Sequence, residues 1–216
     1  MKLDLAIVDY GMGNLRSVHK ALQHVAPDLS IEITADAQAV KDAIRVVVPG
    51  QSAMPETMAA LNASGLREAV LEAARNKPFL GICLGLQMLF DLSEEGATPC
   101  LGLYPGNVVR FDPALMHDAA GRRLKVPHMG WSPVSQTRVH SLWEGIPDQT
   151  RFYFAHSYFP VSANADLIAG TVDYPDASAP FTCAIGRDTL FAVQFHPEKS
   201  ATAGLKLLAN FVSWNA

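Results

Sequence analysis

Residues 78–90 read Pro-Phe-Leu-Gly-Ile-Cys-Leu-Gly-Leu-Gln-Met-Leu-Phe. The first part is a short apolar run typical of a buried strand, and the rest has the apolar pattern of a helix. Cys83 lies between them, with Gly81 and Gly85 two residues to either side, where a sharp strand-to-helix turn needs glycine. We call this turn at residues 81–85 the elbow. Cys83 is therefore either a nucleophile at a helix start, which favours the thiolate, or a buried structural cysteine.

Strands alternate with helices over the first ninety residues. Besides the strand of the elbow, the apolar runs predict strands at residues 3–10, 31–34 and 45–50, and amphipathic stretches predict helices ending near residue 25 and covering 35–43, 55–61 and 66–76. This alternation predicts a doubly wound, largely parallel sheet. Ligands bind at the carboxyl ends of such strands, where Pro49-Gly50 and Cys83 both fall.

The second half of the chain is rich in strand-like sequence separated by Pro, Asn, Asp and Gly turns. We expect strands within residues 105–111, 126–131, 151–159, 167–172 and 181–195, and a closing amphipathic helix over 201–214. The predicted fold is therefore a three-layer α/β arrangement: a largely parallel central sheet flanked by helices, with a β-rich C-terminal half. No linker or repeat divides it, so we expect one domain over residues 1–216.

Bulk composition excludes several classes of protein. The chain is 49% hydrophobic and 18% charged with a net charge of -4, which allows a sizeable core and disfavours general nucleic-acid binding. Three cysteines make no disulfide framework, and the acidic start and lack of a long apolar window predict a cytoplasmic protein without a membrane span.

The glycine-rich turn after the first strand is similar to the turn of a dinucleotide-binding site. It reads Gly11-Met12-Gly13, but Arg16 stands where a dinucleotide fingerprint has its third glycine, so an ordinary strand–helix turn is the better interpretation. No His and Cys spacing is typical of zinc ligands. We therefore expect no cofactor and no metal.

A cysteine nucleophile needs a base, and the base needs an acceptor that orients it. Seven histidines compete for this role, and His196 is distinguished by Phe195 before it and Pro197-Glu198 after it. Proline restricts His196 to extended backbone, in which residues i and i+2 point the same way, so Glu198 can accept from the imidazole. A strand-end histidine beside a solvated glutamate is the alternative, but together with the elbow a Cys83–His196–Glu198 triad is the better account.

An acyl-transfer site also needs donors for the oxyanion. The backbone N–H of Leu84, directly after the nucleophile, is one candidate. Pro49-Gly50-Gln51 ends a neighbouring strand and can supply a second, because glycine lets that peptide turn toward a substrate carbonyl. An ordinary turn is the alternative for this segment.

Taken together, residues 81–87, Pro49-Gly50 and residues 195–198 resemble the class I, triad-type glutamine amidotransferases. Within that family, residues 9–18, 126–131 and 152–158 resemble the glutaminase subunits of imidazole glycerol phosphate synthases, which act in histidine biosynthesis. The resemblance implies that glutamine is hydrolysed and that its ammonia passes to a cyclase of (β/α)8-barrel type within a heterodimer. It also implies low activity of the isolated chain and strong stimulation by the ligand-loaded cyclase.

The same resemblance implies residue roles. Cys83, His196 and Glu198 match the triad, and Gly50 and Gln51 fall on the oxyanion strand. The remaining positions either hold glutamine or lie in motifs that face the cyclase: Gly50, Gln87, Ser157 and Tyr158 in the first group, and Tyr10, Asn14, His128, Met129 and Trp131 in the second. Ser52 and Ser132 depart from the glycine and the asparagine that the family often has there.

Two other functions remain open at this stage. One is a triad glutaminase that serves another synthase, such as anthranilate or GMP synthase. The other is a non-catalytic binding module with an inert cysteine.

Overall fold

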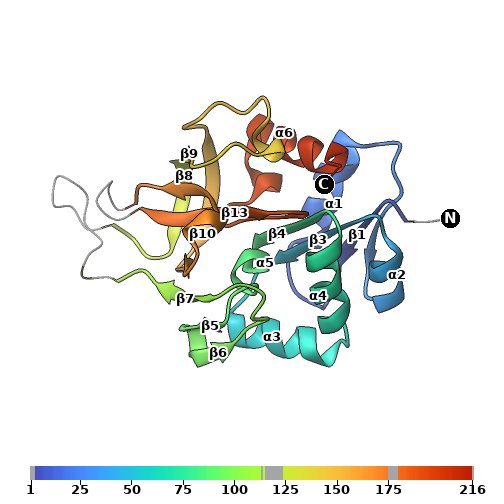
Figure 1. The fold of residues 1–216 in the computed structure, drawn as a ribbon, viewed down its shortest axis with the longest axis horizontal. Helices are drawn as coiled ribbons and strands as arrows, with labels where there is room; N and C mark the ends of the chain where they lie inside the picture. Colours follow the sequence, from blue (N-terminus) through green and yellow to red (C-terminus); the bar gives the residue numbers. More distant parts are fainter. Residues whose placement is uncertain (1–2, 113, 115–123, 175–179, 216) are drawn as a thin grey trace.

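An eight-stranded sheet runs through the computed structural model, which describes residues 3–112, 114, 124–174 and 180–215 (Figure 1). Its strands are β1 (Leu5–Val8), β2 (Ile31–Thr34), β3 (Arg45–Gly50), β4 (Phe79–Cys83), β9 (Ser135–Gln136), β12 (Ile168–Val172), β13 (Phe181–Arg187) and β14 (Leu190–Val193). In the order β2-β1-β3-β4-β14-β13-β12-β9, the first five strands are parallel and the rest antiparallel. Strands from both halves of the chain therefore share one sheet.

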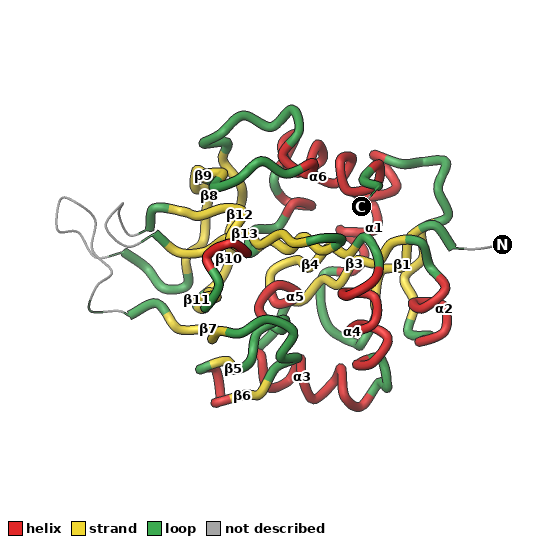
Figure 2. The backbone as a smooth tube through the Cα atoms, in the orientation of Figure 1, coloured by secondary structure: helices red, strands yellow, loops and turns green. Residues whose placement is uncertain are grey.

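Helices cover both faces of this sheet (Figure 2). They are α1 (Leu15–Val25), α2 (Ala37–Asp42), α3 (Met54–Ala63), α4 (Arg67–Asn76), α5 (Leu84–Gln87) and α6 (Ala201–Ser213). Successive strand residues point to opposite faces, so Ile7 packs in one core with Leu22 of α1 and Leu208 of α6, while Val8 joins a second core with Val70 of α4. The predicted three-layer α/β fold is confirmed.

The second half adds two smaller sheets beside the central one. β8 (His128–Pro133) pairs antiparallel with β10 (Arg151–His156), and a four-stranded sheet has the order β11-β7-β5-β6. The strands of the latter are β5 (Leu92–Ser93), β6 (Thr98–Pro99), β7 (Gly106–Arg110) and β11 (Tyr158–Ser162). Short 3₁₀ helices connect the strands: η1 (Glu95–Ala97), η2 (Ser141–Trp143), η3 (Ala165–Leu167) and η4 (Pro197–Lys199).

Three expected elements differ from the sequence pattern. The expected strand over 151–159 is two strands that part at Ser157, and the one over 181–195 is the β13–β14 hairpin, turned at Asp188 with φ 49°. The helix after the elbow ends at Gln87 instead of continuing to residue 90. It stops because the carbonyls of residues 88–90 accept hydrogen bonds from the N–H groups of residues 101–104.

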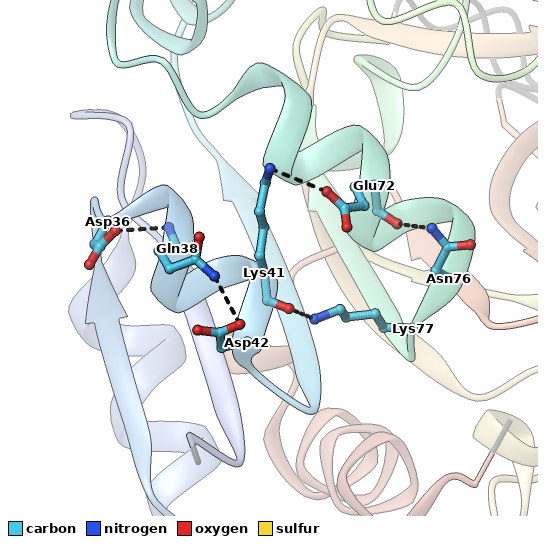
Figure 3. A network of polar contacts seen from close by, with 7 residues as sticks. All are labelled: Asp36, Gln38, Lys41, Asp42, Glu72, Asn76 and Lys77. Atoms are coloured by element: carbon cyan, nitrogen blue, oxygen red, sulfur yellow. Dashed lines mark hydrogen bonds and ion pairs between the residues drawn. The ribbon is translucent and has the colours of Figure 1, made fainter. Parts of the chain in front are cut away.

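A polar network joins α2, α4 and Lys77, which precedes β4 (Figure 3). Cys83 is at the other end of β4. Lys41 lies 3.4 Å from Glu72, and Lys77 donates to the Lys41 carbonyl. Both side chains of the ion pair are substantially exposed, and such pairs contribute about 0–1 kcal/mol. Within the described ranges, no helix is both long and apolar enough to cross a membrane.

Candidate active site

Cys83 lies in a strained turn between β4 and α5, with φ 55° and ψ -107°. The flanking glycines are required sterically. A Cβ on Gly85 would lie 1.9 Å from the Val48 carbonyl oxygen, and one on Gly81 would lie 2.6 Å from the Gly85 carbonyl oxygen. Neither contact is tolerable, because both involve backbone atoms of buried elements. The elbow therefore fixes the Cys83 side chain at the carboxyl end of the parallel strands.

His196 connects Cys83 to Glu198. Its Nδ1 lies 2.9 Å from Glu198 Oε1, its ring interacts with the Cys83 side chain, and the His196 and Glu198 side chains are only 4% and 1% exposed. Burial alone lowers the pKa of His196, but the hydrogen bonds and charges of Cys83 and Glu198 outweigh it and raise the pKa from 6.5 to about 10. The arrangement favours an imidazolium beside the Cys83 sulfur.

The backbone that brings Glu198 to His196 differs from the expected one. His196 is extended, with φ -103° and ψ 97°, as its position before proline predicts. Glu198, however, lies in the 3₁₀ turn η4, where the Lys199 N–H donates to the His196 carbonyl. The carboxylate therefore meets the imidazole by a tight turn, and the expected i, i+2 contact in extended chain is wrong in its geometry.

Gly50 ends β3 directly opposite Cys83. A Cβ at this position would lie 2.5 Å from Leu84 Cβ and 3.0 Å from the Tyr10 hydroxyl, so only glycine fits between them. The Tyr10 hydroxyl donates to the Pro49 carbonyl at 2.6 Å, and burial raises the pKa of this phenol. The side chain of Tyr10 is 3% exposed and so supports the Pro49–Gly50 peptide instead of presenting a contact surface.

A cavity of about 190 Å³ opens beside Cys83. This is smaller than the 300–1,000 Å³ typical of drug-sized ligands and suits a small substrate. The cavity is lined by residues of the elbow, the β3 end and the β10–β11 segment: Gln51, Ser52, Cys83, Leu84, Gln87, Glu95, Pro127, Ala155, His156, Ser157 and Tyr158. Three of the four residues expected to hold glutamine line this space, and the fourth, Gly50, does not. Two of the three expected oxyanion residues, Leu84 and Gln51, line it as well.

Gln87 is held rigidly in this cavity. Its Nε2 donates to the Tyr158 carbonyl at 2.8 Å and to Gln194 Oε1 at 2.9 Å, and Gln194 Nε2 lies 3.5 Å from Cys83 Sγ. Gln194 was not among the expected site residues, although its place two residues before His196 on the same apolar run was a usable signal. Glu95 was also missed, because nothing local to residues 93–99 indicates the cavity.

The residues expected at a partner interface divide by exposure. Met129 and Trp131 are 65% and 46% exposed and line a groove of about 910 Å³ that also includes Arg110 and Lys125. His128 lines this groove but is only 4% exposed, and its ring stacks on Tyr174. A further member, Asn14, is partly buried at the start of α1. Within the described part of the chain, no group of three or more His, Cys, Asp or Glu side chains could hold a metal ion.

Comparison with known proteins gives a consistent result. The family described as glutamine amidotransferase class-I matches residues 6–214. The imidazole glycerol phosphate synthase subunit HisH of Thiobacillus denitrificans is 58% identical over 215 residues, covering 100% of this chain and 93% of the relative. The subunits of the same name from Aromatoleum aromaticum and Nitrosospira multiformis are each 60% identical over 211 residues, covering 98% of both chains.

Solved structures agree on the fold. A putative GMP synthase protein from Thermoplasma acidophilum superposes with a TM-score of 0.69 at 19% identity, covering 98% of this chain and 93% of that one. The structure of PurLQS from Thermotoga maritima gives 0.66 at 16% identity and covers 98% of both chains. The family match spans nearly the whole sequence, and the elbow places Cys83 beside His196 and the cavity. This chain therefore belongs to the class I glutamine amidotransferases.

Proposed function

We propose that this chain is the glutaminase subunit of an imidazole glycerol phosphate synthase, hydrolysing glutamine to glutamate and ammonia in histidine biosynthesis. The assignment to this synthase rests on the HisH relatives, which are 58–60% identical over nearly the whole chain. The chemical step rests on one observation: a buried imidazole that is hydrogen-bonded to Glu198 and interacts with Cys83. One domain carries the activity, because strands from both halves join one sheet.

The reaction follows from these positions. The Cys83 thiolate attacks the side-chain carboxamide carbon of glutamine, and the electron pair of the C=O bond moves to oxygen. The backbone N–H of Leu84 and the Gly50–Gln51 peptide stabilise that oxyanion, at about 2.7–4 kcal/mol per donor. His196 then gives its proton to the departing nitrogen, so that ammonia leaves and a glutamyl thioester remains. Water, deprotonated by His196, hydrolyses the thioester and regenerates Cys83.

Glutamine itself lies in the cavity beside the elbow. Gln87, Ser157 and Tyr158 line that cavity and are the residues proposed to hold it. Both hydrogens of the Gln87 amide are engaged by the protein, so its carbonyl oxygen is the group that faces the ligand. Such an acceptor suits the ammonium group of an amino acid.

The product ammonia requires a second subunit. The partner is a cyclase of (β/α)8-barrel type that forms a heterodimer with this chain, and the exposed Met129 and Trp131 beside the groove are its proposed contacts. Asn14 is a further proposed contact, whereas Tyr10 and His128 are buried, and of these two only His128 lines the groove. The three cysteines are free thiols, which supports a reducing, cytoplasmic location.

The function is tested by measuring glutamate release from glutamine with the chain alone, with its cyclase, and with the cyclase plus its ribulotide ligand. We expect low activity alone and strong stimulation by the loaded cyclase. Full activity of the isolated chain would contradict the proposed dependence on the partner. Stimulation by the synthase component of an anthranilate or GMP synthase, and none by the cyclase, would assign the glutaminase to another synthase.

A further inference from the structure

Two histidines lie between the surface groove and the cavity, and the reaction as described uses neither. His128 on β8 and His156 on β10 are direct neighbours in the antiparallel register, and His128 Nδ1 lies 3.2 Å from His156 Nε2. Their exposed fractions are 4% and 5%. A buried pair of this kind is costly unless its hydrogen bonds are satisfied, so its bonding partners are informative.

The hydrogen bonds determine which nitrogen of each ring carries the proton. A carbonyl oxygen only accepts, so His156 Nδ1 donates to the Tyr158 carbonyl at 2.8 Å. A neutral His156 then accepts at Nε2 from His128 Nδ1. A neutral His128 in turn accepts at Nε2 from the Ser132 hydroxyl, 2.9 Å away. The bonds thus run in one direction, from Ser132 to Tyr158.

Both rings are neutral near pH 7, as this order requires. Burial lowers the pKa of His128 to about 4. Burial, and then the neighbouring His128, lower the pKa of His156 to about 3. A proton added to His156 Nε2 would place two N–H groups against each other, whereas one added to His128 Nε2 would require the Ser132 hydroxyl to accept instead of donate.

The chain of bonds continues into the cavity. The Tyr158 carbonyl that accepts from His156 also accepts from Gln87 Nε2, which fills both of its lone pairs. Gln87 in turn donates to Gln194, whose amide lies 3.5 Å from Cys83 Sγ. The direction in which the Gln87 carbonyl oxygen points therefore depends on a carbonyl that His156 holds in place.

We propose that His128 and His156 are positioning residues for glutamine binding, which fix the Tyr158 carbonyl, and through it the Gln87 amide, by a one-directional chain of hydrogen bonds from Ser132. The inference rests on the proposed function, because it takes glutamine as the ligand of the cavity. Ser132 directly follows Trp131, which is 46% exposed at the groove. A partner that contacts this groove therefore lies next to Ser132, the first donor of the hydrogen-bond chain.

The principal test is His156→Phe, assayed in the complex with the cyclase. Phenylalanine suits the site because Phe111, Phe154 and Phe181 surround the imidazole, with ring centroids 5.3, 5.6 and 5.1 Å away. We expect KM for glutamine to rise about tenfold with kcat close to that of the unchanged complex, because the substituted residue orients a binding group. A purely structural role would reduce the fraction of active enzyme and so lower kcat at constant KM, which would overturn the proposal.

A matched control and a rescue sharpen this test. The control, His140→Phe, removes another histidine that packs against aromatic rings, those of Phe191 and Trp214. Nδ1 of His140 accepts from the Leu142 N–H, away from the cavity, so we expect this variant to leave KM for glutamine unchanged. Ser132→Ala removes the first donor and should raise KM about threefold, whereas Ser132→Asn keeps a donor and should restore it. An unchanged KM in both His156→Phe and Ser132→Ala would overturn the proposal.

A second readout separates this inference from the proposed function. Long-range ¹⁵N NMR of the imidazole rings in the full chain should show the Nδ1–H tautomer for both His128 and His156 at neutral pH. The Nε2–H tautomer in either ring would overturn the chain of bonds. If the complex releases no glutamate, the proposed function fails and the glutamine part of the inference fails with it, while the NMR signals still decide whether the chain of bonds exists.

Discussion

Replacing Glu198 by glutamine removes one charge from the buried Cys83–His196–Glu198 arrangement and changes little in shape. The pKa of His196 rises from 6.5 to about 10 under the combined influence of Cys83 and Glu198, against the effect of burial. Loss of Glu198 removes one of the two groups that hold the proton on His196, and so disfavours the imidazolium. Loss of the oriented imidazole adds to this, so we expect kcat/KM to fall about 10²- to 10⁴-fold.

Stability should change far less than activity. Within the described residues Glu198 Oε2 is buried without a hydrogen-bond partner, so the new amide leaves its N–H₂ unsatisfied at a cost of about 1–3 kcal/mol, partly offset by the removal of a buried charge. Glutamate release in the complex and chemical denaturation of the chain measure the two effects. Glu72→Gln is the control, because Glu72 pairs with Lys41 at the far end of the sheet (Figure 3). A kcat/KM for Glu198→Gln equal to that of Glu72→Gln would refute the triad reasoning.

Three further outcomes follow from the same structure. Gly85→Ala should destabilise the chain by about 3 kcal/mol or more, since its Cβ would lie 1.9 Å from the Val48 carbonyl oxygen; an unchanged denaturation midpoint would contradict the close approach. Tyr10→Phe should lower the free energy of unfolding by about 1 kcal/mol and reduce glutamate release, because the Pro49 carbonyl loses its buried donor; retention of both would show that this bond does not hold the peptide. The pKa of His156 is about 3 in the folded chain and near 6.5 in the unfolded chain. Neutral His156 therefore contributes fully to the free energy of unfolding above pH 6.5, and this contribution falls as the pH drops below 6.5, by on the order of 3 kcal/mol at pH 4. Urea titrations at several pH values should show this loss, and His156→Phe should reduce it without abolishing it, because buried His128 and His140 also have lowered pKa values, of about 4. An equal loss in the variant would assign the acid sensitivity elsewhere.

The elbow and its catalytic partners could be predicted from sequence because their requirements are local. Gly81 and Gly85 are dictated by contacts within one turn and with the adjacent strand, and His196 and Glu198 are two residues apart. Even there, the 3₁₀ turn that joins His196 to Glu198 was not expected, since Pro197 restrains the residue before it more strongly than the residue after it.

The parts that sequence could not supply depend on contacts between distant segments. The helix after the elbow ends early because the N–H groups of residues 101–104 donate to the carbonyls of residues 88–90. The bond between His128 and His156 depends on the register of β8 against β10, which no local pattern specifies. Burial of Tyr10 likewise depends on β3, so its motif suggested a surface role that its 3% exposure does not support.

The most direct test of the account is glutamate release by Cys83→Ala in the complex with the ligand-loaded cyclase, beside Cys100→Ala as a matched control. Cys100 is also a buried free thiol, but it lies near the Thr98 carbonyl and away from the cavity. The account predicts that Cys83→Ala abolishes glutamate release and that Cys100→Ala leaves it intact. Glutamine turnover that survives in Cys83→Ala would contradict the assignment of Cys83 as the nucleophile.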